Sequence, residues 1–421
     1  MAKFLLKTKI TFHLLASSHF RVFIMFLDFG VSNFGSFREG VHVIFHSPRD
    51  EKIIHLVLCV KGANASGKTQ LLKALTFLQW FCSESFKELG VEDDIPVSAF
   101  KGHEDEPTYL YARVMLNNVI LTYESEITRK GVVYETIRRK IQRDTIILQR
   151  NGDAIVSPTP KNIVSGLKNI TLRSNSSIIS TVNQYQLDID DSFKQLFQFF
   201  KLYFSNINIC RYDNNTQERC LNSITQIMNS TPEMFNFVKN SIRIFDNSLT
   251  NITLRKDLNG CLVPFFEYAN GENKFEIDCY SQSQGLKTLF TSLGWYYRQL
   301  KEGGTLILDD FDTVLHPHIL PFLIELFTNK EINATNAQLI FITQNTEIMK
   351  SLDKSCIYLV NKENSESYAY PISDLGQQVA RITDITKLYN TGKLGGTPPQ
   401  KSSWNMEELW QQDKTEKLPQ N

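Results

Sequence analysis

The residues from Gly62 to Thr69 have the side-chain types and the spacing that bind phosphate groups. Their sequence, Gly62-Ala63-Asn64-Ala65-Ser66-Gly67-Lys68-Thr69, fits the pattern G-x-x-x-x-G-K-[ST]. The glycines let backbone N–H groups turn toward the phosphates, Lys68 adds a positive charge, and the Thr69 hydroxyl can ligate Mg²⁺. We therefore expect the residues from Gly62 to Gln70 to bind ATP together with Mg²⁺.

Two acidic residues, Asp309 and Asp310, follow the apolar run from Thr305 to Leu308. A phosphate loop needs a carboxylate that reaches the Mg²⁺ shell from the end of a neighbouring strand. Asp309 is predicted to be this metal-side acid, next to Thr69. Asp310 stands where a catalytic carboxylate would orient or deprotonate the attacking water. A solvated strand end would explain an isolated aspartate pair, but the phosphate loop upstream favours the catalytic interpretation.

A second candidate for phosphate contact is the segment from Ser281 to Lys287, which opens a predicted helix ending near Leu300. A serine and a glycine at a helix start, here Ser283 and Gly285, can offer a hydroxyl and N–H groups to a γ-phosphate, including one held by a second subunit. An ordinary helix N-cap is the alternative. The distance of about 25 residues to the acidic strand favours the phosphate contact.

The surrounding sequence alternates apolar runs with turn residues and so predicts an α/β fold. Apolar runs at 25–31, 41–47 and 53–60 predict strands, and leucines at helical spacing follow the phosphate loop in 70–81. Residues 109–140, rich in β-branched and aromatic side chains, predict antiparallel hairpins. Helices are expected at 191–204 and 232–245, and a βαβ-like block between about 275 and 371.

These patterns predict a P-loop NTPase of the ABC/SMC type with an antiparallel β lobe and an inserted helical subdomain. We place an extension or upstream-start tail at 1–24 and the first part of the ATPase domain at 25–160. The helical insertion is expected at 161–260, the second part of the ATPase domain at 261–397, and a loosely held tail at 398–421. The chain has no repeats of 20 to 50 residues and no sustained heptads.

Composition indicates a cytoplasmic globular protein. The 45 basic and 45 acidic residues balance, so nucleic acid would need a local patch. No apolar window of about 18 residues predicts a membrane span, and Lys7, Lys9 and His13 interrupt the only stretch that imitates a secretory signal. His316 and His318 have no carboxylate or cysteine at matching spacing, so only Mg²⁺ is predicted as a metal. Reduced thiols are expected for the seven scattered cysteines: Cys59, Cys82, Cys210, Cys220, Cys261, Cys279 and Cys356.

The order of the motifs resembles the ABC-type ATPases of the SMC/RecF/OLD branch. It is most similar to the stand-alone ATPases of bacterial abortive-infection and phage-defence systems, of the RloA and AbiLii kind. The segments that carry the resemblance are GANASGKT, SQSQGLK, LILDDFDTVLHPHIL and QLIFITQNTEIM, with VSNFGSFREG and ITKLYNTGKLGGTPP at the two ends.

The resemblance implies roles for further residues. Ser283 and Gly285 would form the signature segment that closes on ATP held by a partner subunit. Residues 312–316 would form the D-loop at the dimer interface, and Thr343-Gln344-Asn345 the switch segment. The resemblance therefore implies self-association as a homodimer or a higher oligomer.

Three positions depart from the pattern of this family. Gln344 replaces a histidine that senses the γ-phosphate, Asp310 replaces the commoner glutamate, and Gly35 stands where an arginine is usual. The first two changes remove a chargeable group and shorten the catalytic carboxylate. We therefore expect slow turnover by the catalytic set of Asp310, Gln344 and Lys68.

The sequence leaves three functions open. The first is an ATPase subunit of an anti-phage system that controls a separately encoded effector such as a Toprim-like nuclease, since only about 75 residues follow the switch segment. The alternative is a RecF-like ATPase of genome maintenance that acts directly on DNA. A transporter subunit is the third, and it is disfavoured because about 210 residues separate the phosphate loop from the signature segment.

Overall fold

The computed structural model describes residues 24–116, 118–209, 216–312, 315–376 and 384–398. The predicted N-terminal tail, except Ile24, and the predicted C-terminal tail beyond residue 398 lie outside these ranges.

A six-stranded sheet forms the centre of the protein because its strands carry apolar side chains on both faces. On β5, Val57 and Cys59 face one way and Leu58 and Val60 the other, and all four are buried. The first five strands are parallel and the last is antiparallel. The strand order is β11 (Tyr203–Ser205), β15 (Thr305–Leu308), β16 (Gln338–Ile342), β5 (Val57–Gly62), β17 (Ile357–Glu363) and β18 (Glu366–Pro371).

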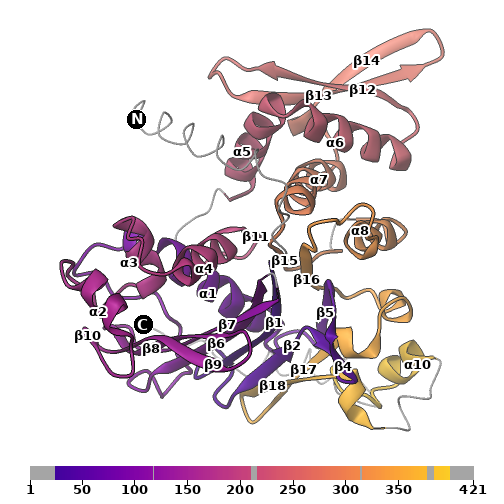
Figure 1. The fold of residues 1–421 in the computed structure, drawn as a ribbon. Helices are drawn as coiled ribbons and strands as arrows, with labels where there is room; N and C mark the ends of the chain where they lie inside the picture. Colours follow the sequence, from indigo (N-terminus) through magenta and orange to yellow (C-terminus); the bar gives the residue numbers. More distant parts are fainter. Residues whose placement is uncertain (1–23, 117, 210–215, 313–314, 377–383, 399–421) are drawn as a thin grey trace, which may run out of the picture.

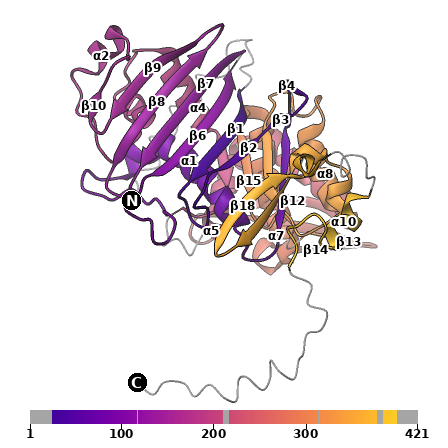
Figure 2. The ribbon, with the colours of Figure 1, turned by 90° about the horizontal axis from the view of Figure 1, so that it is seen from below.

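One face of this central sheet is covered by helix α1 (Lys68–Glu88), which packs on a seven-stranded antiparallel sheet on its other side (Figures 1 and 2). The predicted hairpins at 109–140 are confirmed as three strands of that sheet. Its order is β10 (Ala154–Ile155), β9 (Asp144–Asn151), β8 (Val132–Lys140), β7 (Val119–Ile127), β6 (Thr108–Leu116), β1 (Ile24–Ser32) and β2 (Val41–Ile44). A short hairpin of β3 (His46–Ser47) and β4 (Asp50–Ile54) leads into β5.

The opposite face of the central sheet shares a second apolar core with another set of helices. These are α5 (Thr216–Ser230), α6 (Pro232–Phe245), α7 (Gln284–Glu302), α8 (Ile319–Thr328) and α10 (Ile385–Asn390). A three-stranded antiparallel sheet of β12 (Leu249–Lys256), β13 (Leu262–Asn270) and β14 (Asn273–Asp278) packs on α5 and α6. This small sheet lies at the end of the molecule farthest from the seven-stranded sheet (Figure 1).

The segment 161–260 differs from the single helical subdomain predicted for it. Helices α2 (Lys161–Leu167), α3 (Ile178–Gln184) and α4 (Asp191–Lys201) belong to the first apolar core, and α3 and α4 pack against α1. The next residues form strand β11 at the edge of the central sheet. Of the helices described in this range, α5 and α6 alone form a helical insertion, and strand β12 follows within the predicted range. The helices of this segment therefore belong to two separate cores.

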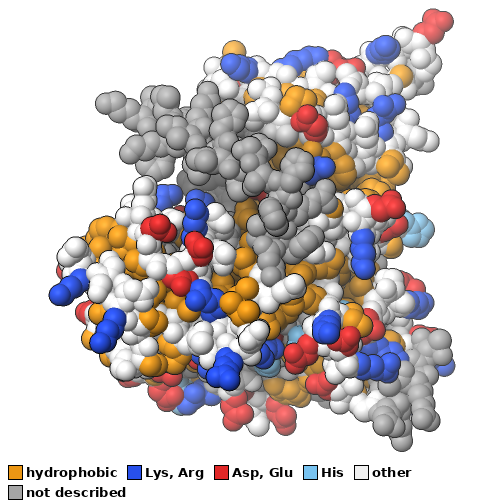
Figure 3. All heavy atoms as spheres, in the orientation of Figure 1, with side chains coloured by type: hydrophobic (Ala, Val, Ile, Leu, Met, Phe, Trp, Pro, Cys, Tyr) orange, Lys and Arg blue, Asp and Glu red, His pale blue; other side chains and the backbone are white. Residues whose placement is uncertain are grey.

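Charged side chains of both signs are interspersed on the face drawn in Figure 3. This distribution agrees with the balanced composition. In the described part of the chain, no helix has both the length and the apolar character that a membrane span requires.

Candidate functional site

The predicted phosphate loop joins the end of β5 to the start of α1, as the sequence pattern requires. At Gly62 a Cβ atom would collide with the carbonyl oxygen of Val360 and with Ser66 Oγ, so only glycine fits between β5 and β17. Gly67 has a φ of 109°, in the region that favours glycine. These two glycines thus allow the backbone to wrap tightly before the helix begins at Lys68.

Lys68 is folded back over this loop. Its Nζ atom donates hydrogen bonds to the carbonyl oxygens of Gly62 at 2.9 Å and Ala63 at 2.7 Å. The side chain is 7% exposed, and burial lowers the pKa of its ammonium while the carboxylates of Asp309 and Asp310 oppose that shift. The ammonium is held by neutral carbonyls, which the oxygens of a phosphate group can replace.

Thr69 and Asp309 meet across the site although 240 residues separate them. The Thr69 hydroxyl donates to Asp309 Oδ2 at 2.7 Å. A hydroxyl and a carboxylate oxygen are the hard ligands that Mg²⁺ prefers. This pair therefore suits the metal that the phosphate loop implies.

Asn206, which follows β11, holds the backbone of Asp309 from the edge of the sheet. Its Oδ1 atom accepts from the Asp309 N–H and its Nδ2 donates to the Asp309 carbonyl oxygen, both at 2.8 Å. No pattern around Asn206 distinguished it in the sequence, because the contact depends on β11 joining the sheet beside β15.

Asp310 has a left-handed backbone with a φ of 50°, which turns the chain sharply away from β15. Its N–H donates to Asp309 Oδ1 at 2.9 Å. Burial, with the nearby carboxylates of Asp309 and Asp312, raises the pKa of Asp310, and Lys68 partly offsets the effect. A raised pKa is the usual condition of a carboxyl group that exchanges protons with substrate or water.

The predicted switch segment is held against the acidic strand end by Asp312. Its carboxylate accepts from the N–H of Gln344 at 3.1 Å and of Asn345 at 2.9 Å. The Gln344 side chain in turn donates from Nε2 to Asn64 Oδ1 of the phosphate loop at 3.4 Å. The structure thus brings Gln344, the phosphate loop and the aspartates together.

Two polar atoms beside the phosphate loop are buried and have no hydrogen-bond partner among the described residues: Ser66 Oγ and Gln70 Oε1. Both flank Lys68 and Thr69 in the sequence, and such unpaired atoms are costly unless a ligand satisfies them. Gly35 packs directly against Gln70, and a Cβ at Gly35 would collide with its amide oxygen. The arginine usual in related sequences would not fit beside Gln70 as placed.

Ser283 and Gly285 lie apart from these groups. Ser283 caps α7, since its side chain accepts from the Leu286 N–H at 3.3 Å. Among the described residues, neither Ser283 nor Gly285 makes a hydrogen bond to the phosphate loop or to the aspartates. Within this chain Ser283 is therefore the N-cap of α7, and the phosphate contact of Ser283 and Gly285 stays a prediction.

Two other groups could suggest a metal. His316 and His318 are exposed, and the nitrogen of one ring accepts from the backbone N–H of the other residue. Ligand atoms of His55, Asp353 and Cys356 lie within 4.8 Å of one another, but the His55 ring already bonds to Ser355 Oγ at 2.9 Å. Internal hydrogen bonds account for both groups, so we assign a metal to neither.

Comparison with known proteins identifies the family of this chain. Residues 57–350 match the model of a family described as AAA domain, putative AbiEii toxin, Type IV TA system. A search of curated proteins finds no match. Similar solved structures include the SMC head domain from Thermotoga maritima, with 16% identity and a TM-score of 0.41 over 82% of this chain and 98% of that one. The SMC head domain with a coiled coil and joint from Pyrococcus yayanosii has 12% identity and a TM-score of 0.43 over 87% of this chain and 100% of that one.

Proposed function

This chain belongs to the family described as AAA domain, putative AbiEii toxin, Type IV TA system, and from that membership we propose that it is an ATP-binding, slowly hydrolysing subunit of a bacterial defence system. ATP would join two copies of the chain, and the nucleotide state would control a separately encoded effector. Membership supports the ATPase part, and the family description supports the toxin–antitoxin or defence setting.

The observation that carries the ATP proposal is the convergence of Lys68, Thr69 and Asp309. On binding of MgATP the Lys68 ammonium would exchange its two backbone carbonyls for phosphate oxygens, with which it forms stronger, charge-assisted contacts. Thr69 and Asp309 provide oxygen atoms on the metal side. The metal neutralises phosphate charge, which is the chemistry that Mg²⁺ supplies in such sites. The unpaired oxygens of Ser66 and Gln70 belong to residues that flank Lys68 and Thr69 in the chain.

Slow hydrolysis is proposed from Asp310 and Gln344. The raised pKa of Asp310 suits a base that takes a proton from water. Its side chain is one methylene shorter than the glutamate usual in related ATPases, so its reach is shorter. Gln344 contacts the phosphate loop and donates a hydrogen bond, but an amide cannot carry the positive charge of a histidine. Together these features favour a switch over a rapid motor.

Dimerisation is proposed from the signature segment. Ser283 and Gly285 have no contact with the phosphate loop of their own chain among the described residues. The start of α7 presents N–H groups that favour an anion. A second copy that places this helix start on the γ-phosphate would complete the site.

Sedimentation with and without MgATP tests this proposal. We expect ATP to shift the native protein toward a dimer or a larger species, while Lys68→Ala remains unchanged. The control is Lys87→Ala, a lysine of the same helix whose side chain is 65% exposed and pairs with Glu84; it should behave like native protein. Calorimetry that detects no ATP binding to the native chain would refute the proposal.

The effector part has its own test. Tagged chain expressed with its genomic neighbours should retain one of them, and retention should change when ATP is replaced by ADP. Failure to retain any neighbour, together with duplex DNA binding that ATP stimulates and salt weakens, would instead favour a RecF-like role.

A further inference from the structure

Lys61 is buried in a place where a lysine is unusual. It is the residue of β5 just before Gly62, and only 1% of it is exposed. Lysine is almost never fully buried unless its charge is paired. Among the described residues Lys61 forms no ion pair. Its Nζ donates instead to the carbonyl oxygens of Thr343 and Asn345, each at 3.1 Å.

These two carbonyls belong to the switch segment, which is therefore hydrogen-bonded through both its C=O groups and its N–H groups. Asp312 accepts the N–H groups of Gln344 and Asn345, and Lys61 donates to the carbonyl groups of Thr343 and Asn345. The residue between the two carbonyls is Gln344, whose amide reaches the phosphate loop. A negative group on the N–H side and a positive group on the C=O side fix the direction of this turn.

Helix α10 closes over the Lys61 ammonium. The ring of Tyr389 lies with its centroid 5.3 Å from Lys61 Nζ. The hydroxyl of Thr386, on the same helix, donates to the carbonyl oxygen of Thr346, just beyond the switch segment, at 3.3 Å. Tyr389 is itself anchored by a 2.9 Å bond from its hydroxyl to the Gly396 carbonyl. Exclusion of water by this helix strengthens the bonds from Lys61 to the switch segment.

We propose that Lys61 is a positioning residue for ATP hydrolysis. It holds the backbone of Thr343, Gln344 and Asn345 in place so that the side-chain amide of Gln344 faces the phosphates. This inference rests on the proposed function for its catalytic consequence. Lys61 shares a face of β5 with Val57 and Cys59, which belong to the second apolar core. Its Nζ is bonded to the Thr343 and Asn345 carbonyls, so we assign Lys61 no contact with the nucleotide.

The test uses Lys61→Met, which keeps the length of the side chain but has no donor. In nucleotide-free protein, hydrogen exchange at the amides of Gln344 and Asn345 should quicken at least tenfold. The kcat for ATP should fall at least tenfold, whereas the Kd for ATP should change less than threefold because the phosphate loop is intact. Lys61→Arg should recover part of kcat, since a guanidinium can donate to the same carbonyls. Unchanged exchange and unchanged kcat in folded Lys61→Met would overturn the proposal.

A second variant covers the case in which Lys61→Met does not fold. Tyr389→Leu leaves Lys61 in place but admits water to its ammonium, and it should quicken exchange at the same two amides by several-fold. No change there would also overturn the proposal. The two proposals fail separately: native protein without ATPase activity refutes the function, while the exchange measurement, which needs no nucleotide, still tests Lys61.

Discussion

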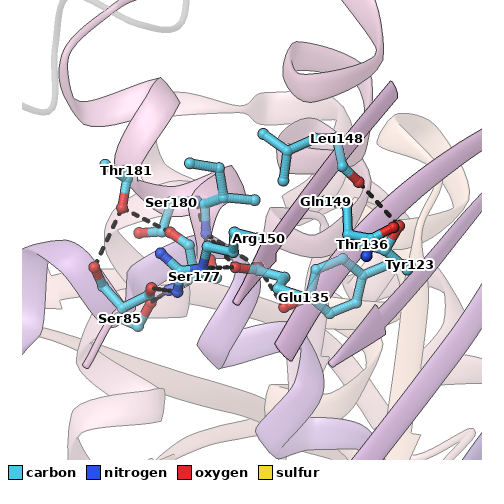
Figure 4. A network of polar contacts seen from close by, with 12 residues as sticks. Ser85, Tyr123, Glu135, Thr136, Leu148, Gln149, Arg150, Ser177, Ser180 and Thr181 are labelled. Atoms are coloured by element: carbon cyan, nitrogen blue, oxygen red, sulfur yellow. Dashed lines mark hydrogen bonds and ion pairs between the residues drawn. The ribbon is translucent and has the colours of Figure 1, made fainter. Parts of the chain in front are cut away.

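Replacing Glu135 by glutamine should remove about 3–5 kcal/mol of folding free energy, because the change leaves a buried arginine without its counter-charge. Glu135 on β8 and Arg150 on β9 are both completely buried, and Arg150 Nε lies 2.8 Å from Glu135 Oε2 (Figure 4). The Arg150 Nη2 donates to the Ser176 carbonyl at 2.7 Å, but Nη1 has no partner among the described residues. Most compensation for the buried positive charge therefore comes from Glu135.

The carboxylate also accepts from two further donors. The hydroxyl of Tyr123 donates to Glu135 Oε1 at 2.7 Å, and the N–H of Ile178, at the start of α3, donates to both oxygens at 3.0 and 3.1 Å. Glutamine has one acceptor oxygen, so its NH₂ group must face either these donors or Arg150. Each buried donor left without an acceptor costs about 1–3 kcal/mol. This cost supports a total loss of folding free energy of at least about 3 kcal/mol for Glu135→Gln.

Thermal and urea unfolding of the two forms measure this loss. With an unfolding entropy of about 2.1 cal/mol/K per residue, a chain of 421 residues loses roughly 1 °C of Tm per 1 kcal/mol, so a decrease of about 3–6 °C is expected. Glu124→Gln is the matched control, because Glu124 pairs with Arg138 on the same sheet at a partly exposed position and should cost about 0–1 kcal/mol. Equal losses in the two variants, or a loss below about 1 kcal/mol for Glu135→Gln, would refute the reasoning.

Three further predictions concern the site. Asp310→Asn should lower kcat by about 10²–10⁴. It should not lower stability at neutral pH, because the pKa of Asp310 is raised in the folded protein and its charge is therefore disfavoured there. Native kcat/KM, which reports the free protein, should fall as the pH decreases through that raised pKa, and a flat profile would contradict the assignment. Gly62→Ala should abolish ATP binding in calorimetry and cost about 1–3 kcal/mol in unfolding, because the new methyl group meets the Val360 carbonyl; retained binding would contradict it. Gln344→His should raise kcat about tenfold or more by restoring a chargeable donor; steady-state assays check it, and an unchanged rate would show that Gln344 does not limit turnover.

The parts of the site that the sequence predicts well are contiguous or follow directly on an apolar strand. Gly62 to Thr69 form one unbroken motif, and Asp309 and Asp310 come immediately after β15. Such patterns fix local geometry, and parallel strands then bring Asp309 to Thr69. The roles of the site residues remain predictions, but their meeting in space followed from the order of strand, loop and helix.

The parts that the sequence did not predict depend on long-range neighbours. Asn206 matters only because the three-residue strand β11 joins the edge of the sheet, and three residues carry no usable periodicity. Strands β12 and β13 had a signal that was missed, since Asp257 to Gly260 form a turn between two runs of β-branched and aromatic residues. The buried Lys61 looked like an ordinary charged residue at a strand end.

The eight residues from Lys61 to Lys68, at the end of β5 and the start of α1, join the switch segment to the phosphate loop. Lys61 donates to the switch segment and Lys68 to the phosphate loop, and Gly62 between them lies so close to the Val360 carbonyl that a side chain would collide with it. A phosphate that draws Lys68 away from the Gly62 carbonyl therefore acts on the residue bonded directly to Lys61. Asp312 binds the same switch segment from the acidic strand end, and its carboxylate lies near Asp310. A movement of the switch segment is therefore expected to change the surroundings of Asp310 as well. We therefore expect a change at Lys61 to reach the hydrolytic groups through the switch segment and to appear in kcat, while the Kd for ATP changes little.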